Sequence, residues 1–235
     1  MTKTRSPIAN FEKEITELTA HLIELSIVDS YNLAVRRDVG GDISVLEAEY
    51  WSNPDHKPDI FSRVPYEEFY TMLSSDRSYD LRFLDGALAQ LRFEFKKGSR
   101  GHLMRSRLAY FPSPDLTPYQ EDPEIYLRDE IYGDVVDLRS VSIPFRFDYD
   151  GSDATARDLH HPKSHVTLGQ YPHCRIAASG PITPYYFVEF VLRSFYRTSS
   201  WLATPDLPKP RATSGTTITN AESSLIHFGL PTTRW

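Results

Sequence analysis

The stretch Leu81-Arg-Phe-Leu-Asp-Gly-Ala-Leu-Ala-Gln-Leu-Arg-Phe-Glu-Phe-Lys-Lys97, continued by a basic turn and by residues 102–111, decides the fold. Asp85-Gly86 is a strong signal for a two-residue β-hairpin. In the strand that follows, every second residue is apolar, which puts one set of side chains on a single face: Ala87, Ala89, Leu91, Phe93 and Phe95. With a third strand over residues 102–111, the stretch predicts an antiparallel meander.

Two helices flank this sheet. Apolar residues that recur at steps of three and four predict an amphipathic helix over about residues 10–28. Thr183-Pro184 supplies a cap and a first-turn proline for a strongly apolar helix over residues 185–196. We therefore predict the α+β class, with a curved antiparallel sheet, an N-terminal amphipathic helix and a packed C-terminal helix.

Three further strands are expected downstream, over residues 141–149, 166–168 and 174–176. No internal repeat or long linker divides the chain. Residues 1–201 are predicted to form a single domain, and residues 202–235, rich in proline, threonine and serine, a partly irregular tail.

The composition indicates in which cellular compartment the protein is expected and which partners it is not expected to have. The chain has 235 residues, a formal net charge of −6 and one cysteine, so no internal disulfide can form. No segment approaches the roughly 18 apolar residues that a membrane span requires, and the first thirty residues do not resemble a signal peptide. We expect a cytoplasmic protein without a membrane partner.

A local excess of positive charge stands out against this acidic average. Between residues 96 and 107 the chain carries five cations and no acid, and these form the candidate nucleic-acid-binding set: Lys96, Lys97, Arg100, Arg105 and Arg107. Such a strip can bind phosphates although the whole protein is acidic. The alternative is a solvated hairpin whose charges protect an edge strand from aggregation.

The candidate catalytic site lies in a histidine-rich window. Histidine changes its charge near neutral pH, and four of the eight histidines fall within residues 160–173. If the three downstream strands pair, alternation brings five polar residues onto one surface: Arg146, Asp148, His165, His173 and Arg175. An imidazole, a carboxylate to orient it and arginines to hold a phosphate fit acid–base chemistry on a phosphodiester. A stabilising ion-pair network is the competing interpretation.

Other chemistries remain open. His160 or His161, with His165, His173 and Cys174, offers enough ligands for zinc, although the spacing matches no standard finger. Asp85 with Glu94-Phe95-Lys96 resembles the Asp…Glu-x-Lys core of restriction-endonuclease-like nucleases, in which carboxylates hold magnesium. His165-x-Thr167 resembles one strand of the two-histidine phosphoesterases, but a second such strand is not found. No cofactor is certain, and both Mg²⁺ and Zn²⁺ stay open.

Several motifs together resemble an uncharacterised bacterial family, domain of unknown function 2290. They are Arg107-x-x-Tyr110-Phe111-Pro112, Phe145-Arg146-Phe147-Asp148-Tyr149, His161-Pro162-x-x-His165-x-Thr167-Leu168-Gly169, Cys174-Arg175-Ile176 and the helix over residues 187–196. The resemblance covers about residues 10–201. It implies a component of an anti-phage defence system and a helicase, encoded nearby, as partner. It implies no catalytic residues.

Two classes of function follow. The first is a nucleic-acid-processing effector, a nuclease or toxin-like phosphodiesterase, in which Tyr110 and Phe111 stack single-stranded bases and His165 moves protons. The second is a non-catalytic adaptor that binds nucleic acid or regulates the helicase. A small-molecule enzyme with a closed pocket is a third alternative. The sequence does not separate DNA from RNA, or an enzyme from a binding module.

Overall fold

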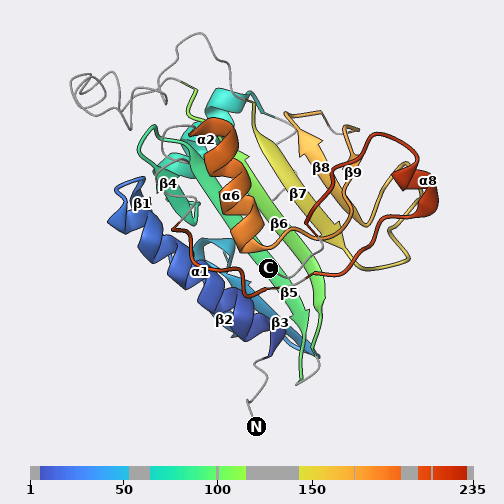
Figure 1. Cartoon of the computed structure of the whole chain (residues 1–235). Helices are drawn as coiled ribbons and strands as arrows, with labels where there is room; N and C mark the ends of the chain where they lie inside the picture. Colours follow the sequence, from blue (N-terminus) through green and yellow to red (C-terminus); the bar gives the residue numbers. More distant parts are fainter. Residues whose placement is uncertain are drawn as a thin grey trace.

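The computed structural model describes residues 6–52, 64–98, 101–114, 143–171, 173–196, 206–212 and 214–231. Within them, helices pack against an open antiparallel sheet of nine strands (Figure 1). The helices are α1 (Pro7–Glu24), α2 (Tyr66–Ser75), α6 (Pro184–Phe195) and α8 (Asn220–Ser223). The strands are β1 (Val28–Tyr31), β2 (Val35–Asp38), β3 (Ile43–Glu47), β4 (Leu81–Phe83), β5 (Leu88–Lys96), β6 (Leu103–Phe111), β7 (Phe145–Asp150), β8 (Ser164–Leu168) and β9 (Ile176–Ala177).

The long strands β5 and β6 form the centre of the sheet. The strand order is β1-β4-β5-β6-β7-β8-β9, while β3 pairs with the second half of β5 and carries β2 at its outer side. Gly86, at a φ of +84°, occupies the β4–β5 turn in the left-handed region that favours glycine. The predicted three-stranded meander is thus confirmed as β4-β5-β6, and β7 to β9 extend it by the same antiparallel pairing.

Several helices and strands begin or end at residues other than those predicted. α1 begins three residues earlier than expected, because Pro7 occupies the first turn, where its fixed φ favours a helix. The strand expected over residues 141–149 begins at Phe145, and that expected over residues 174–176 begins at Ile176. The sequence suggests a short strand over residues 43–51, but β3 ends at Glu47 and is followed by a short 3-10 helix, Glu49–Ser52. An element expected near residues 125–132 lies outside the described residues.

The two faces of the sheet are covered differently. α1 and α6 lie side by side over one face, where alternate residues of β5, including Phe93 and Phe95, are buried against Phe11 of α1 (Figure 1). On the opposite face, α2 covers one end through an apolar cluster that includes Leu88 and Phe111. Beyond α2 that face becomes polar, and this part carries the candidate site.

The described parts of the C-terminal segment also contact the sheet and its helices. Leu207 and Ala212 are buried in the main core. Phe228 forms a β-bridge with Ala178, just after β9, and its ring packs edge-on against Phe147. α8 begins with a capping box, in which the Thr219 side chain accepts from the Glu222 amide. These contacts fix the segment beside β9.

Candidate functional site

Strand register collects the polar side chains into rows that cross the sheet. The central row follows the pairing Glu47–Arg92–Arg107–Asp148–His165 across β3, β5, β6, β7 and β8. The outer row, one pleat further from α2, is Glu94–Arg105–Asp150, and the inner row, one pleat closer, contains Arg146 and Thr167. All these residues share one face because side chains two apart on a strand point the same way.

These rows line a groove, here called the arginine groove, with a volume of about 460 Å³. Its lining includes five arginines and three carboxylates, so its charged lining is positive although the protein as a whole is acidic. The arginines are Arg92, Arg105, Arg107, Arg146 and Arg175; the carboxylates are Glu94, Asp148 and Asp150. Arg92 and Arg107 are direct cross-strand partners, an arrangement of like charges that is unfavourable unless anions lie between or beside them.

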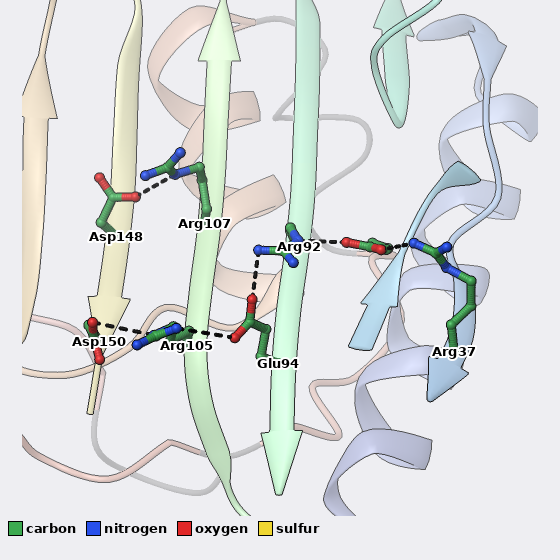
Figure 2. A network of polar contacts seen from close by, with 8 residues as sticks. Arg37, Arg92, Glu94, Arg105, Arg107, Asp148 and Asp150 are labelled. Carbon is green, nitrogen blue, oxygen red and sulfur yellow. Dashed lines mark hydrogen bonds and ion pairs between the residues drawn. The ribbon is translucent and has the colours of Figure 1, made fainter. Parts of the chain in front are cut away.

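Carboxylates within the rows compensate most of these cations (Figure 2). Arg92 contacts Glu94 at 2.7 Å, between Nη1 and Oε1, and Glu47 at 2.5 Å, between Nε and Oε2. Glu47 also pairs with Arg37 of β2. In the outer row Arg105 lies between Glu94 and Asp150, at 3.8 and 3.3 Å. The strip that is acid-free in sequence is therefore neutralised in part by acids from neighbouring strands.

Asp148 is the anionic centre of the groove. Its Oδ1 accepts a hydrogen bond of 2.9 Å from Nε of Arg107, and its Oδ2 pairs with Nε of Arg146. Burial alone would raise the pKa of Asp148, but the charges of Arg107 and Arg146 outweigh burial and hold that pKa below its ordinary value. Asp148 is consequently ionised throughout the neutral range, and both guanidinium groups stay oriented toward the centre of the groove.

His165 lies beside this centre with only 5% of its surface exposed. Its Nδ1 is 2.9 Å from the Pro162 carbonyl, which can only accept, so Nδ1 carries the proton and donates. Its Nε2 lies 3.8 Å from Oδ2 of Asp148. Burial lowers the pKa of His165, and the opposing effect of Asp148 does not restore it. At neutral pH His165 is therefore an uncharged base with its lone pair on Nε2.

The orienting role expected of Asp148 accordingly belongs to Pro162. Asp148 is nearer to Nε2, the atom that would receive a proton, and its charge stabilises the imidazolium that results. The geometry thus separates two functions: a backbone carbonyl fixes the tautomer, and a carboxylate favours the protonated product.

Two further residues complete this end of the groove. The His161 ring lies 5.2 Å from the His165 ring, centroid to centroid, and its Nδ1 is buried without a hydrogen-bond partner among the described residues. Arg175 lines the groove and forms no ion pair with any residue that the structure describes, so its guanidinium is available to an anion. Arg146 and His165 line the same groove, and the charge of Arg175 adds to burial in lowering the pKa of both.

Four of the five predicted catalytic residues come together: Arg146, Asp148, His165 and Arg175. His173 is not brought to the groove: it is exposed in the turn before β9 and does not line the groove. It was paired with Arg175 on the assumption of a strand over residues 174–176, whereas β9 begins at Ile176, so alternation does not extend to residue 173.

The five predicted nucleic-acid-binding residues do not all lie at the groove. Arg105 and Arg107 line the groove. Lys96 is exposed at the end of β5, and Lys97 turns toward the β2–β3 connection, where its Nζ donates to the Gly41 carbonyl and lies 3.6 Å from Asp38. Neither lysine lines the groove. Arg100 lies outside the described residues.

The described residues provide no set of ligands for a zinc ion. His160, His161, His165, His173 and Cys174 are all described, yet no three His, Cys, Asp or Glu side chains in the described part of the chain are grouped closely enough to hold a metal ion. His160 and His173 are exposed, whereas His165 is buried at the β8 end of the central row. A shared metal would need these side chains to converge.

The magnesium-nuclease alternative is not supported by the geometry either. Asp85 is partly buried in the β4–β5 turn, where its Oδ1 accepts from the Tyr196 hydroxyl of the segment ending α6. Glu94 lies nearly the whole length of β5 away and on the opposite face, in the outer row. The two carboxylates therefore cannot share an ion.

Base stacking on Tyr110 and Phe111 is also ruled out. Tyr110 is 1% exposed and packs under α6 against Phe195, and Phe111 is 4% exposed beneath α2 against Phe69. Both rings belong to the core.

The comparison with family models agrees with the motif resemblance. Residues 27–230 match the model described as uncharacterized conserved protein (DUF2290). The chain belongs to this family. No curated protein and no solved structure matches it. The DUF2290 match covers every strand of the sheet, so the arginine groove lies within the matched residues.

Sequence reasoning missed part of the DUF2290 groove. Arg92, Glu47 and Asp150 line or support it, but they were not linked to Arg107 and Asp148. Part of the signal was present, since alternation puts Arg92 and Arg107 on the same face of a β5–β6 hairpin; the register that makes them direct partners comes from the structure. His161 was considered only as a zinc ligand. Among the described residues, no helix of this DUF2290 chain is long and apolar enough to cross a membrane.

Proposed function

We propose that this protein binds nucleic acid in the arginine groove and cleaves its phosphodiester backbone, with His165 as general base. The observation that carries the proposal is the central row: strand register brings two arginines, an ionised carboxylate and a neutral histidine together in one groove. Arginines suit phosphate because their planar donors match its oxygens.

The chemistry assigned to each residue follows from its surroundings. Arg107, Arg146 and Arg175 bind the phosphoryl oxygens and stabilise the negative charge that grows on them. The attacking hydroxyl or water loses its proton to Nε2 of His165 as its oxygen bonds to phosphorus. The bond from phosphorus to the leaving oxygen breaks, and that oxygen is protonated by the imidazolium or by solvent. Asp148 stabilises the imidazolium in between.

The test is cleavage of labelled single- and double-stranded DNA and RNA by purified protein, with EDTA, magnesium or zinc. We expect cleavage that survives EDTA and falls at least about 100-fold in His165→Ala, the range typical of losing a general base. His227→Ala is the matched control, because His227 is exposed and does not line the groove. Equal rates in wild type and His165→Ala would refute the catalytic role.

One observation favours a binding module instead. His165 is almost fully buried, and most groove arginines already have carboxylate partners. If the protein is a binding module, no condition yields cleavage of nucleic acid. His165→Ala then binds nucleic acid as the wild type does, whereas Arg107→Gln abolishes salt-sensitive binding. The same experiment therefore separates the effector from the adaptor.

The cellular role belongs to the same proposal: a component of an anti-phage defence system that acts with a helicase encoded nearby. It is supported by the motif resemblance. The helicase would deliver separated strands to the groove. Co-expression with the neighbouring gene, followed by affinity purification, tests the partnership; loss of phage protection in His165→Ala, with the complex intact, tests the effector role.

A further inference from the structure

The arginines of the groove are spaced along the strands at regular intervals. Arg105 and Arg107 are two residues apart on β6, and Arg146 of β7 pairs with Ala109, the next residue of the same face. The outer, central and inner rows thus each contribute arginine, in consecutive steps of about 6.8 Å along the strands, since a strand rises ~3.4 Å per residue. This step is comparable with the distance between successive phosphates in an extended single strand.

From this spacing we infer that the groove takes single-stranded nucleic acid whose backbone runs parallel to β6 and β7, with three successive phosphates in the outer, central and inner rows. The inference rests on the proposed function and names its substrate class. The middle phosphate lies in the central row, beside Arg107 and Nε2 of His165, and is the one cleaved. The outer phosphate is held by Arg105, and the inner one by Arg146 together with Arg175, which forms no ion pair among the described residues.

The shape of the groove favours one strand over two. α2 closes the face beyond the inner row, where Leu88 and Phe111 are covered. The remaining hollow, about 460 Å³, is far smaller than a duplex segment but comparable to one nucleotide with its neighbouring phosphates. The five arginines line this one hollow, whereas a duplex presents the phosphates of two strands and would need cations spread over a wider surface.

The ion pairs explain how such a strand would be accepted. Arg105 has 55% of its side chain exposed, and its contacts with Glu94 and Asp150 are 3.8 and 3.3 Å long, so solvent already competes for them. Phosphate oxygens can replace these loose contacts. The shorter pairs of Asp148 with Arg107 and Arg146 stay in place and present the remaining guanidinium donors to the strand.

Fluorescence anisotropy provides the test, with oligonucleotides of 2 to 12 nucleotides, the matching duplex, and single strands in which one linkage at a time is an uncharged methylphosphonate. We expect affinity to rise up to about four nucleotides and then to level off, with the single strand preferred over the duplex at least 10-fold. The salt dependence should have a slope of about −2, that is ~0.7 for each of three phosphates. Methylphosphonate should weaken binding at three consecutive linkages only.

Arg105→Gln, Arg107→Gln and Arg146→Gln should each reduce the slope by about 0.7. Arg193→Gln is the matched control, because this exposed arginine belongs to α6, on the opposite face of the sheet. Equal or tighter binding of duplex, or an unchanged slope in all three groove variants, would overturn the inference. Cleavage confined to duplex would overturn it and leave the proposed function standing; single-strand binding with the predicted footprint but no cleavage would do the reverse.

Discussion

At the scale of single residues, the chemistry proposed for the groove depends on how the charge of Asp148 affects the protonation of His165. Burial keeps His165 neutral by lowering its pKa, and Asp148 opposes this at 3.8 Å from Nε2. Removing the carboxylate's charge in Asp148→Asn therefore lowers the pKa of His165 further. The neutral base then persists to lower pH, while the imidazolium formed in the reaction loses its counter-charge.

For Asp148→Asn we expect the acidic limb of the pH–rate profile to move to lower pH and kcat to fall about 100-fold. The measurement is cleavage rate against pH between 4 and 8, at saturating substrate. A purely structural role would lower rates uniformly and leave the position of the limb unchanged. An acidic limb at the same pH as in wild type would contradict the assignment of His165 as the base.

A second residue gives the fold its own pH dependence. Asp80 is fully enclosed, and its Oδ2 accepts from the Tyr50 hydroxyl at 2.5 Å and from the Leu91 amide at 2.8 Å. Burial raises the pKa of Asp80 to about 7. Between the ordinary pKa of an aspartate and this value the native state binds the proton more tightly than the unfolded chain does, so stability falls as pH rises through that window.

Asp80→Asn should therefore flatten the pH dependence of stability between pH 4 and 7, a span on the order of 3–4 kcal/mol in wild type. The amide oxygen can accept both bonds that reach Oδ2. Urea unfolding at several pH values measures this pH dependence of the free energy of unfolding. Asp42→Asn is the control, because Asp42 is exposed. Part of the slope that remains belongs to Asp85, whose pKa burial raises to about 6, and part to Glu14 and Asp29, whose pKa values burial also raises. A wild-type curve that rises across this window would show that Asp80 is not protonated in the native state.

At the scale of elements, the alternation of apolar and polar residues in β5 predicted which side chains the strand buries and which side chains face solvent on the other side of the sheet. Phe93 and Phe95 enter the core under α1, and Arg92 and Glu94 face the groove, as period two requires. What alternation alone does not supply is the pairing partner. Arg92 meets Arg107 because the β5–β6 hairpin closes in one register, with an irregularity between Glu94 and Phe95 that the sequence does not reveal.

The end of the sheet was harder to predict for a related reason. β9 is only two residues long, so its position depends on pairing with β8 and on Phe228 beyond it. Local pattern carries little information over such a length. The same limit applies to the downstream site residues: Arg175 lines the groove and His173 does not.

In the outer row, Glu94 and Asp150 flank Arg105 and compete with an anion for it, so removing an acid should strengthen anion binding. Glu94 contacts both Arg92 and Arg105. In Glu94→Gln the two guanidinium groups lose a competing carboxylate, so binding of single-stranded oligonucleotides should tighten about 3-fold to 10-fold at low salt, with a steeper salt dependence. Fluorescence anisotropy measures this affinity and its salt dependence. Glu189→Gln is the control, because Glu189 pairs with Arg193 on α6. Weaker binding in Glu94→Gln would mean that Glu94 positions the arginines and does not compete for them.

At the scale of the whole molecule, one buried carboxylate joins three distant parts of the chain. Glu14 of α1 is 1% exposed; its Oε1 accepts from the Tyr185 amide at 2.8 Å, and its Oε2 accepts from the Arg211 and Ala212 amides at 2.6 Å each. Burial raises the pKa of Glu14, while these three amides oppose it. The start of α6 and the C-terminal segment are thus both fixed to α1, behind the sheet that carries the groove.

Glu14→Gln leaves one oxygen where two carboxylate oxygens served three amides, and it puts an NH₂ group against an N–H donor. We expect the free energy of unfolding to fall by about 1–3 kcal/mol, the cost of leaving a buried donor unpaired. Trypsin should also cut faster after Arg211, since the amides of residues 211 and 212 are released; the bond after Lys209 precedes a proline and resists cleavage. Glu12→Gln, on the same helix without these contacts, controls for loss of charge. If Glu14→Gln unfolds at the same urea concentration as Glu12→Gln and Arg211 stays protected, then apolar contacts of Leu207 and Ala212, not Glu14, hold the C-terminal segment in place.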